Sequence, residues 1–243
     1  MYKESYMYVI ALFLFQIVFL SLTLPFYLVY LVLLIPGLKK ARKPFVSFVI
    51  KVWAKSFLIA TRAKLTVIDK RKNPKVNDGI CYITNHQSMI DILVIISSLP
   101  GPIGFIAKKE LLVIPVINIW MMAMGCVFLD RKNLRKSVAA IKKGSENIKN
   151  GNNMVIFPEG TRSQGGPHHE FKRGSFHLAT DCDSNLIPLT LDGSYKLLEK
   201  RSKDRTVILT IHEMIPIAGM SREDKKQLPE RIEKTILDEL TAR

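Results

Sequence analysis

The sequence lacks charge over a long N-terminal stretch, paired cysteines, and the common nucleophile and nucleotide-binding motifs. Between Ser5 and Leu38 there is no charged residue over 34 consecutive positions. The three cysteines are scattered and form no C-x-x-C pair, which argues against a disulfide scaffold or zinc ribbon and favours a reducing compartment. The patterns G-x-S-x-G, G-x-x-x-x-G-K-[ST] and G-x-G-x-x-G are absent. Neither a serine-hydrolase nucleophile nor a nucleotide-binding loop is therefore indicated.

Positive charge is abundant but unevenly placed. The 243 residues include 36 Lys and Arg against 21 Asp and Glu, a formal net charge of +15. Residues 39–75 hold 12 basic residues and one acid, so +11 of the total lies directly behind the uncharged run. With 48% hydrophobic residues the chain is not a disordered tail, and its length suits one domain with an appendage. This arrangement favours a membrane over nucleic acid as the partner.

The uncharged run is long enough to cross a bilayer, because about 20 apolar residues suffice for a spanning helix. Pro25 lies near its middle and Pro36 near its end, and proline kinks a helix. Two interpretations stay open: a kinked spanning helix, or a segment that enters and leaves one leaflet. A signal peptide is disfavoured, because its apolar core would be only about 7–15 residues. The basic cluster at residues 39–43 predicts a cytoplasmic location for the chain that follows.

Residues 44–60 are predicted to form a second membrane element. Ser47, Lys51 and Lys55 recur every four positions as a narrow polar stripe on an otherwise apolar helix. Such a helix is typical of the membrane interface, with its lysines directed at anionic headgroups. The alternative is a core helix of the domain that follows. We therefore predict a membrane-associating helical region at residues 1–60 and an α/β domain at residues 61–243.

Strand-like and helix-like segments alternate after residue 61, which predicts a mixed, largely parallel sheet flanked by helices. The clearest helix is 134–149, with Gly151 positioned to end it. The predicted strands are 64–69, 80–84, 104–107, 126–129, 154–157, 187–191 and 206–211. The other predicted helices are 88–99, 115–124, 175–182 and 221–240.

Four short motifs lie at the ends of predicted strands, where α/β sheets usually bind ligands. In the first, at residues 85–91, His86 and Asp91 would lie roughly 140° apart on one continuous helix. If His86 lies in the preceding loop and Asp91 in the first turn, the carboxylate can reach the imidazole and leave its other nitrogen as a general base. The alternative is a helix cap, with Ser88 at N-cap and Asp91 at N3.

The second motif, Phe-Pro-Glu-Gly-Thr-Arg-Ser at residues 157–163, combines a glycine that permits close backbone approach with an arginine suited to a phosphate monoester. A polar turn with a surface Glu–Arg pair is the alternative. The other two motifs, at residues 128–131 and 187–190, are ordinary strand ends when taken alone. Lys108 adds a cation near the same edge, although a solvated face would also explain it.

Together and in this order, the four motifs resemble those of the glycerolipid acyltransferase family over residues 62–196. Residues 107–111 and 171–179 also resemble the sequence pattern of the family, and Asn118 departs from that pattern. The resemblance implies transfer of a fatty acyl group from acyl-ACP or acyl-CoA to the sn-2 hydroxyl of lysophosphatidic acid, forming phosphatidic acid. It implies a membrane bilayer as a partner, no nucleic acid, and no metal or cofactor besides the acyl co-substrate.

The resemblance also implies roles for particular residues. His86 would take the hydroxyl proton and Asp91 would orient it, while backbone amides near Ser88 are expected to stabilise the oxyanion. The same reasoning leaves another lysophospholipid or glycerol 3-phosphate open as acceptor, and a non-enzymatic anionic-lipid binder as a distant alternative. The residues expected to bind the acceptor's glycerol phosphate are Glu159, Gly160, Thr161, Arg162, Arg131 and Lys108.

Overall fold

The computed structural model of the chain describes residues 10–11, 14–15, 17–19, 21–74, 78–199 and 202–242. Parts of the uncharged run, residues 5–9, 12–13, 16 and 20, lie outside the described residues, and so does residue 75 at the end of the basic region. Within the described part, no helix is both long enough and apolar enough to cross a membrane.

A seven-stranded sheet forms the centre of the described structure, with strand order β1-β7-β6-β2-β5-β3-β4. Strands β6, β2, β5, β3 and β4 are mutually parallel, while β7 is antiparallel to β6 and β1 is parallel to β7. The prediction of a mixed, largely parallel sheet is confirmed. The strands are β1 (Lys64–Asp69), β2 (Ile80–Thr84), β3 (Ile103–Lys108), β4 (Val127–Leu129), β5 (Asn153–Ile156), β6 (Asn185–Asp192) and β7 (Thr206–Ile211).

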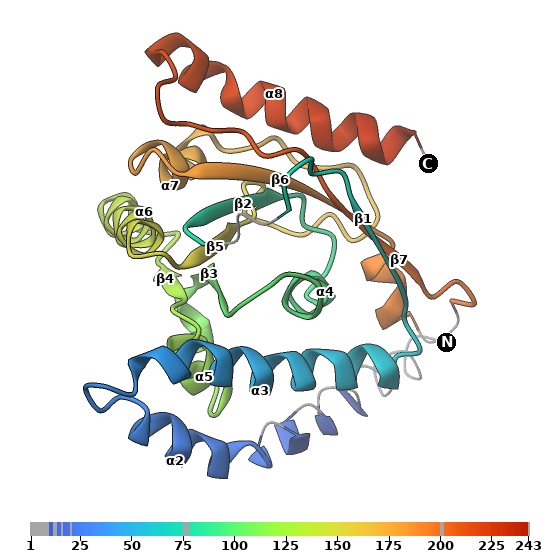
Figure 1. Cartoon of the computed structure of the whole chain (residues 1–243). Coiled ribbons are helices and arrows are strands. Elements are labelled where there is room, and N and C mark those ends of the chain that lie inside the picture. The colour runs from blue at the N-terminus through green and yellow to red at the C-terminus, as the bar shows by residue number, and fades with distance from the viewer. Residues whose placement is uncertain are drawn as a thin grey trace.

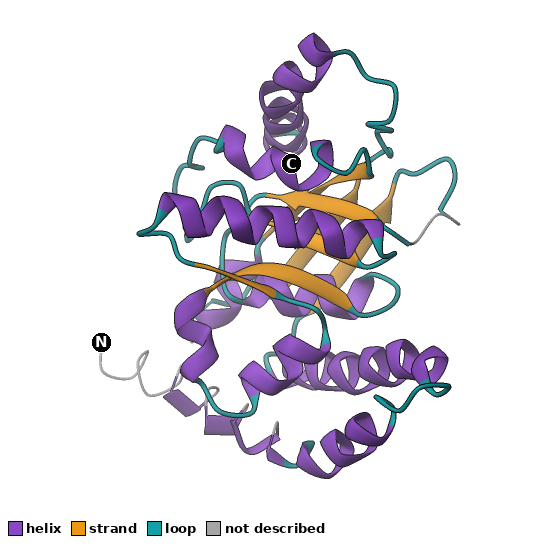
Figure 2. Ribbon diagram, turned by 90° about the vertical axis from the view of Figure 1, so that its left-hand side faces the viewer, coloured by secondary structure: helices purple, strands orange, loops and turns teal. Residues whose placement is uncertain are grey.

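Helices cover both faces of the sheet (Figures 1 and 2). Helix α4 (Ile90–Ser98) lies on one face with α3 (Lys39–Ala60) outside it, and α8 (Arg222–Thr241) lies on the other. The remaining elements are α2 (Leu24–Val32), α5 (Ile117–Ala123), α6 (Leu134–Lys149), α7 (His177–Thr180), and the short 3-10 turns η1 (Lys109–Val113), η2 (Arg173–Phe176) and η3 (Ser194–Leu198).

The central strands read as continuous apolar runs because both of their faces are buried. In β2, Ile80 and Tyr82 join the core beneath α3 and α4, whereas Cys81 and Ile83 join the core beneath α6, α7 and α8. Alternation of side chains along the strand produces this division. The strand at the centre of the sheet therefore connects two hydrophobic cores.

Local signals set the bounds of α6 as the sequence predicted. Asn133 caps the helix by accepting a hydrogen bond from the backbone N–H of Lys136 at 3.0 Å, and Gly151 follows it with φ +75°. Such a left-handed residue ends a helix at little cost only when it is glycine. The predicted helix at 175–182 is instead divided between η2 and α7.

Helix α3 begins at Lys39, five residues before the predicted start, and one of its faces belongs to the core. Ile50 and Ala54 are buried in the same cluster as the side chains of α4. The polar stripe runs beside this face, since Ser47 is buried and Lys51 is half-buried. The alternative of a core helix is thus correct for this face, and α3 shares a core with the domain that follows.

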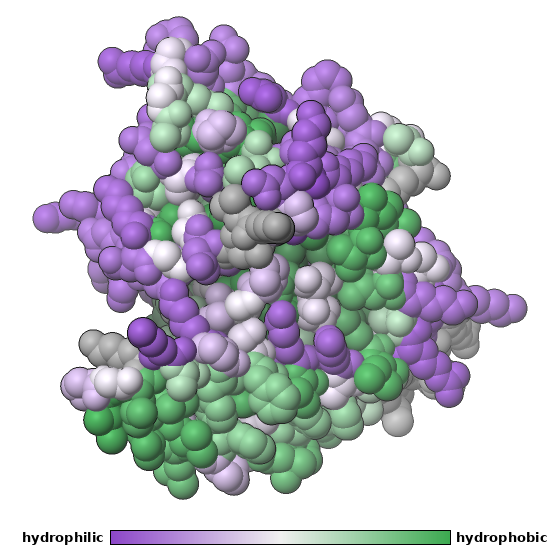
Figure 3. All heavy atoms as spheres, in the orientation of Figure 1, coloured by the Kyte–Doolittle hydropathy of each residue, from purple (hydrophilic) through white to green (hydrophobic). Residues whose placement is uncertain are grey.

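The opposite face of α3 and most of α2 carry exposed apolar side chains. Phe48 is 62% exposed, Ile59 76% and Leu28 64%. Pro25 lies in the first turn of α2, where the missing N–H removes no helical hydrogen bond, so it begins a helix instead of kinking one. Figure 3 shows the resulting hydrophobic surface at the end of the molecule formed by this helix pair.

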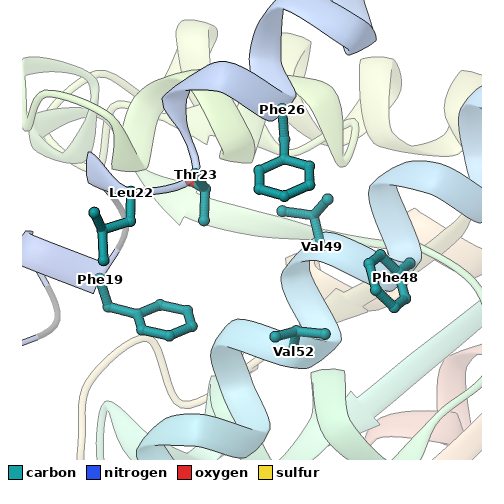
Figure 4. Close-up of a pocket in the computed structure, with 7 residues that line it drawn as sticks. All are labelled: Phe19, Leu22, Thr23, Phe26, Phe48, Val49 and Val52. Atoms are coloured by element: carbon teal, nitrogen blue, oxygen red, sulfur yellow. The ribbon is translucent and has the colours of Figure 1, made fainter.

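A small apolar cavity of about 130 Å³ lies between residues 19–26 and helix α3. Figure 4 shows Phe19 and Phe26 on one side of it, facing Phe48, Val49 and Val52 of α3 on the other. On the domain side, Trp120 of α5 donates its indole N–H to the hydroxyl of Thr23 at 2.7 Å. The segment before α2 is therefore tied to the domain.

Candidate active site

The five parallel strands place their carboxyl ends at one edge of the sheet, and three of the four motifs follow strands at this edge. His86 follows β2 by two residues, Phe157 follows β5 directly, and Arg131 follows β4 by two residues. Lys108 is the last residue of β3. The fourth motif, residues 187–190, was expected at a strand end but lies inside β6, which extends to Asp192.

His86 and Asp91 adopt the geometry that would allow catalysis. His86 lies in the loop before α4 and Asp91 lies in the first turn of that helix. The imidazole Nδ1 and the carboxylate Oδ2 are 2.7 Å apart. An ionised carboxylate can only accept, so Nδ1 carries the proton and Nε2 has the unprotonated lone pair in the neutral ring. Nε2 has no hydrogen-bond partner among the described residues.

The carboxylate of Asp91 is fully buried and accepts several hydrogen bonds. Its Oδ2 accepts the backbone N–H groups of Gln87 at 2.7 Å and Ser88 at 3.0 Å, and its Oδ1 accepts the hydroxyl of Ser194. The N-cap of α4 is Met89 and not, as predicted, Ser88, although the Ser88 N–H does donate to the Asp91 carboxylate. The predicted alternative of a helix cap is thus wrong in its positions, and the same carboxylate also bonds the imidazole of His86.

The backbone amides near Ser88 are engaged inside the loop. Those of Gln87 and Ser88 donate to Asp91, Ile90 N–H donates to the Ser88 hydroxyl, and Asp91 N–H donates to the Ser88 carbonyl. The expectation that backbone amides near Ser88 stabilise an oxyanion stays a prediction, and these four amides already have acceptors within the chain. They hold the loop that carries His86.

Glu159 connects the two principal motifs. It is only 2% exposed, and its carboxylate accepts the backbone N–H of His86 at 2.6 Å and that of His169 at 3.0 Å. Burial raises the pKa of the Glu159 carboxyl, and the two backbone donors offset part of this rise. The contact with an acceptor that the resemblance implied stays a prediction for this residue, whose carboxylate already binds two amides.

The ring of Phe157 stacks on the imidazole of His86, with centroids 4.0 Å apart and planes inclined by 26°. The loop after it also pairs with the loop of His86: Ser163 N–H donates to the His86 carbonyl at 2.9 Å, and Gln164 N–H donates to the Gln87 carbonyl at 3.1 Å. The two motifs thus form one connected structure around the imidazole.

The remaining predicted residues lie at the surface of this edge. Gly160 has φ +70°, and Thr161 and Arg162 are exposed beyond it. Arg131 is exposed too, and neither arginine forms an ion pair within the described part of the chain. Lys108 forms an exposed ion pair with Glu110 at 3.5 Å. Within the described residues, none of these cations contacts His86 directly.

A cavity of about 500 Å³ lies beside Glu159 and Thr161. Lys172 and Arg173 line it together with Glu159 and Glu170, so cations and carboxylates both face it. The ammonium of Lys172 lies over Gly160, because a Cβ added there would be 2.8 Å from Nζ. Among the described residues, no group of three or more His, Cys, Asp or Glu is placed to hold a metal ion.

Sequence reasoning missed the contributions of Ser194 and Asn85 to this site. The amide of Asn85 donates to the Leu191 carbonyl and accepts the Leu191 N–H, both at 2.8 Å, which joins the ends of β2 and β6. Asn85 was within the first motif, so its presence there was a usable signal. Ser194 lies 103 residues from Asp91, and no local pattern marks it.

The sequence of this chain is similar to those of a known protein family. A model of the acyltransferase family matches residues 64–192, just over half of the chain. The chain belongs to the acyltransferase family.

Individual members of the family resemble the chain over most of its length. A 1-acyl-sn-glycerol-3-phosphate acyltransferase of Borreliella burgdorferi is 30% identical over 180 residues, which cover 73% of this chain and 72% of that protein. A chloroplastic enzyme of the same name from Arabidopsis thaliana is 35% identical over 162 residues, 67% of this chain, and the match spans only 45% of the plant protein.

A solved acyltransferase structure also resembles this fold. The crystal structure of the 1-acyl-sn-glycerophosphate acyltransferase PlsC from Thermotoga maritima superposes with a TM-score of 0.80 at 26% identity, covering 99% of this chain and 98% of that one. The α/β architecture with its largely parallel sheet is thus that of a family member of known structure.

Proposed function

We propose that this acyltransferase moves a fatty acyl group from acyl-ACP or acyl-CoA to the sn-2 hydroxyl of lysophosphatidic acid, forming phosphatidic acid. The observation that carries the proposal is the contact of His86 Nδ1 with the buried Asp91 carboxylate, which leaves Nε2 as the base. The names of the similar proteins from bacteria and plants support the choice of acceptor.

The reaction requires one proton shuttle and no acyl-enzyme. Nε2 of His86 removes the proton from the acceptor hydroxyl as its oxygen bonds to the thioester carbonyl carbon. The carbon–sulfur bond then breaks, and the departing thiolate takes the proton from Nε2. Asp91 stabilises the imidazolium that exists between the two steps. Positioned proton transfer of this kind contributes a factor of about 10²–10⁴ in rate.

The exposed cations at the sheet edge suit the phosphate of the acceptor. Arginine presents a planar set of donors that matches phosphate oxygens. We assign this contact chiefly to Arg162, with Thr161, Arg131 and Lys108 assisting. Gly160 allows the acceptor to approach the backbone, because it has no side chain at a left-handed position. The burial of Glu159 supports a role in holding the loops of His86 and His169 together.

We also propose that the α2–α3 pair docks the domain on the cytoplasmic face of a membrane. The exposed apolar side chains of this pair gather at one end of the molecule, and a contiguous exposed apolar surface is typical of a membrane or partner interface. Flotation with phosphatidylethanolamine–phosphatidylglycerol vesicles tests this: Phe48→Asp should weaken vesicle binding. Val138→Asp, at an equally exposed site on α6, should not. Equal binding by both variants would contradict the proposal.

The activity is tested by an acyl-transfer assay with labelled lysophosphatidic acid, offering acyl-ACP and acyl-CoA separately. Wild type should form phosphatidic acid and His86→Ala should not. His177→Ala is the matched control, because His177 also holds a carboxylate, Asp181, at 2.9 Å but is exposed on α7. Retained turnover in His86→Ala would remove His86 as the base. No product from either donor would direct the search to other lysolipids or glycerol 3-phosphate.

A further inference from the structure

Asp91 has a second side-chain partner besides His86. The hydroxyl of Ser194 donates to Oδ1 of Asp91, the oxygen that His86 does not contact. Both residues are 0% exposed, so water does not compete for this bond. A hydrogen bond to a buried charged acceptor is among the stronger ones in proteins. Ser194 is therefore placed to fix the carboxylate plane from the side opposite the imidazole.

The backbone holds Ser194 firmly in this place. It follows β6 through Gly193, which has φ +82°, and a Cβ at Gly193 would lie 2.3 Å from the Thr206 carbonyl oxygen at the start of β7. Only glycine fits there without moving a strand. Asn85 fixes the preceding Leu191 to the loop of His86 by two hydrogen bonds. Hydrogen bonds at Asn85 and a close-packed glycine at 193 thus fix the path from His86 through β6 to Ser194.

The residue after Ser194 contacts the other principal motif. A Cβ at Gly165 would lie 2.5 Å from the ring of Tyr195, so this ring lies directly against the loop that follows Arg162. The η3 turn accordingly touches the Asp91 carboxylate with one side chain and the loop of the second motif with the next. No other described hydroxyl side chain reaches Asp91.

We propose that Ser194 is a positioning residue that holds the Asp91 carboxylate in the orientation His86 requires. The inference rests on the proposed function for its kinetic consequence, although the hydrogen bond itself does not. Removing the hydroxyl leaves a buried carboxylate oxygen without its side-chain donor, so that only the contacts of Oδ2 still hold the plane of the carboxylate. Because the acceptor's phosphate is bound elsewhere, this loss should affect turnover more than affinity.

Kinetics of Ser194→Ala provide the first test. We expect kcat to fall about 10- to 100-fold, the effect of one charge-assisted hydrogen bond. The KM for lysophosphatidic acid should stay within about twofold, because ground-state binding is unaffected. Ser194→Thr, which keeps the hydroxyl, should recover most of the activity. A fall in affinity with unchanged kcat would contradict the proposal.

Two comparisons separate positioning from a general structural effect. Ser145 is also buried, and its hydroxyl bonds only backbone carbonyls of α6 and α7, so Ser145→Ala should lower the melting temperature but not kcat. In an Asp91→Ala background, the further change Ser194→Ala should alter kcat by less than about twofold, because the group it positions is gone. Full additivity would mean that Ser194 acts without Asp91.

A spectroscopic measurement decides the question independently of turnover. The proton that His86 Nδ1 shares with Asp91 should give a strongly downfield NMR signal, identified by its loss in His86→Ala. It should shift or broaden in Ser194→Ala and stay unchanged in Ser145→Ala. An unchanged signal in Ser194→Ala overturns the positioning role even if wild type is fully active. A wild type inactive on all acceptors overturns the proposed function, while this signal still decides the role of Ser194.

Discussion

Two regions of the molecule depart from the usual pattern of burial, and they do so in opposite directions. One is the sheet edge that carries His86, and the other is the α2–α3 pair. At the sheet edge, the carboxylates of Asp91 and Glu159 are buried at 0% and 2% exposure, where charged groups are rare. In the helix pair, large apolar side chains such as Phe48 and Leu28 are more than half exposed. Each departure is unfavourable for a protein alone in water and needs an explanation outside stability.

The two regions differ in whether the protein itself offsets the unfavourable burial or exposure. The buried carboxylates are satisfied internally, since each accepts at least two hydrogen bonds from backbone N–H groups of this chain. The exposed apolar side chains have no such partner on the described protein surface. The first anomaly is therefore satisfied within the protein, and the second is the one for which we proposed docking on a membrane.

Replacing a buried, hydrogen-bonded carboxylate at the sheet edge should give the largest effect on activity. Asp91→Asn replaces the carboxylate with an amide that cannot stabilise an imidazolium, so kcat should fall by about 10²–10⁴. Acyl-transfer assays on the purified variant provide the measurement. Asp181→Asn, which alters the exposed partner of His177, should retain wild-type turnover. A loss no larger than that of Asp181→Asn would remove Asp91 from the mechanism.

The arrangement of Asp91 and His86 could be predicted from the sequence because it is local. Five residues separate them, and a loop followed by the first helical turn brings them together. The bounds of β1, β2, β7 and α6 were predicted to the residue, because turn and cap residues delimit apolar runs there. The Ser194 contact could not be predicted, since only the order of β2 and β6 in the sheet creates it.

The role of α3 was ambiguous for a physical reason. An amphipathic helix with a narrow polar stripe suits both a membrane interface and a protein core, because both environments reward the same apolar side chains. The structure shows that one face of α3 packs in the core and the other is exposed. The sequence pattern alone does not indicate which apolar residues of α3 lie on its buried face and which on its exposed face.

Two substitutions on α3 measure that division. Ile50 is 2% exposed in the core, whereas Phe48 is 62% exposed two residues earlier. Ile50→Ala should lower the free energy of unfolding by about 2–5 kcal/mol, as removal of buried methyl groups does. Phe48→Ala should change it by less than about 0.5 kcal/mol, although it removes more carbon atoms. Denaturant unfolding of both variants in the same detergent gives the comparison.

Equal destabilisation by the two α3 variants would show that Phe48 is buried in the folded protein in solution. That result would also remove the main support for a membrane-facing surface on this helix. Greater loss for Phe48→Ala than for Ile50→Ala would mean that the two faces are exchanged.

Arg162 tests whether the exposed side of the sheet edge binds the acceptor. Its guanidinium is exposed and has no ion-pair partner in the described structure, so Arg162→Ala should leave stability within about 0.5 kcal/mol of wild type. The KM for lysophosphatidic acid should rise about 10- to 100-fold, the loss of a hydrogen-bonded charge pair. Arg222→Ala, exposed at the start of α8, is the control. An unchanged KM would place the phosphate elsewhere.

Glu159 should give the smallest effect, visible as a pH dependence of stability. Burial raises its pKa in the folded state above that of the unfolded chain. Between those two pKa values the folded protein binds more protons, so Glu159 contributes stability at low pH that is lost as pH rises through the folded pKa. Glu159→Gln cannot titrate, so the difference in melting temperature between wild type and variant should change across this interval. A constant difference from acid to neutral pH would mean that the carboxyl is as well solvated in the folded protein as in the unfolded chain.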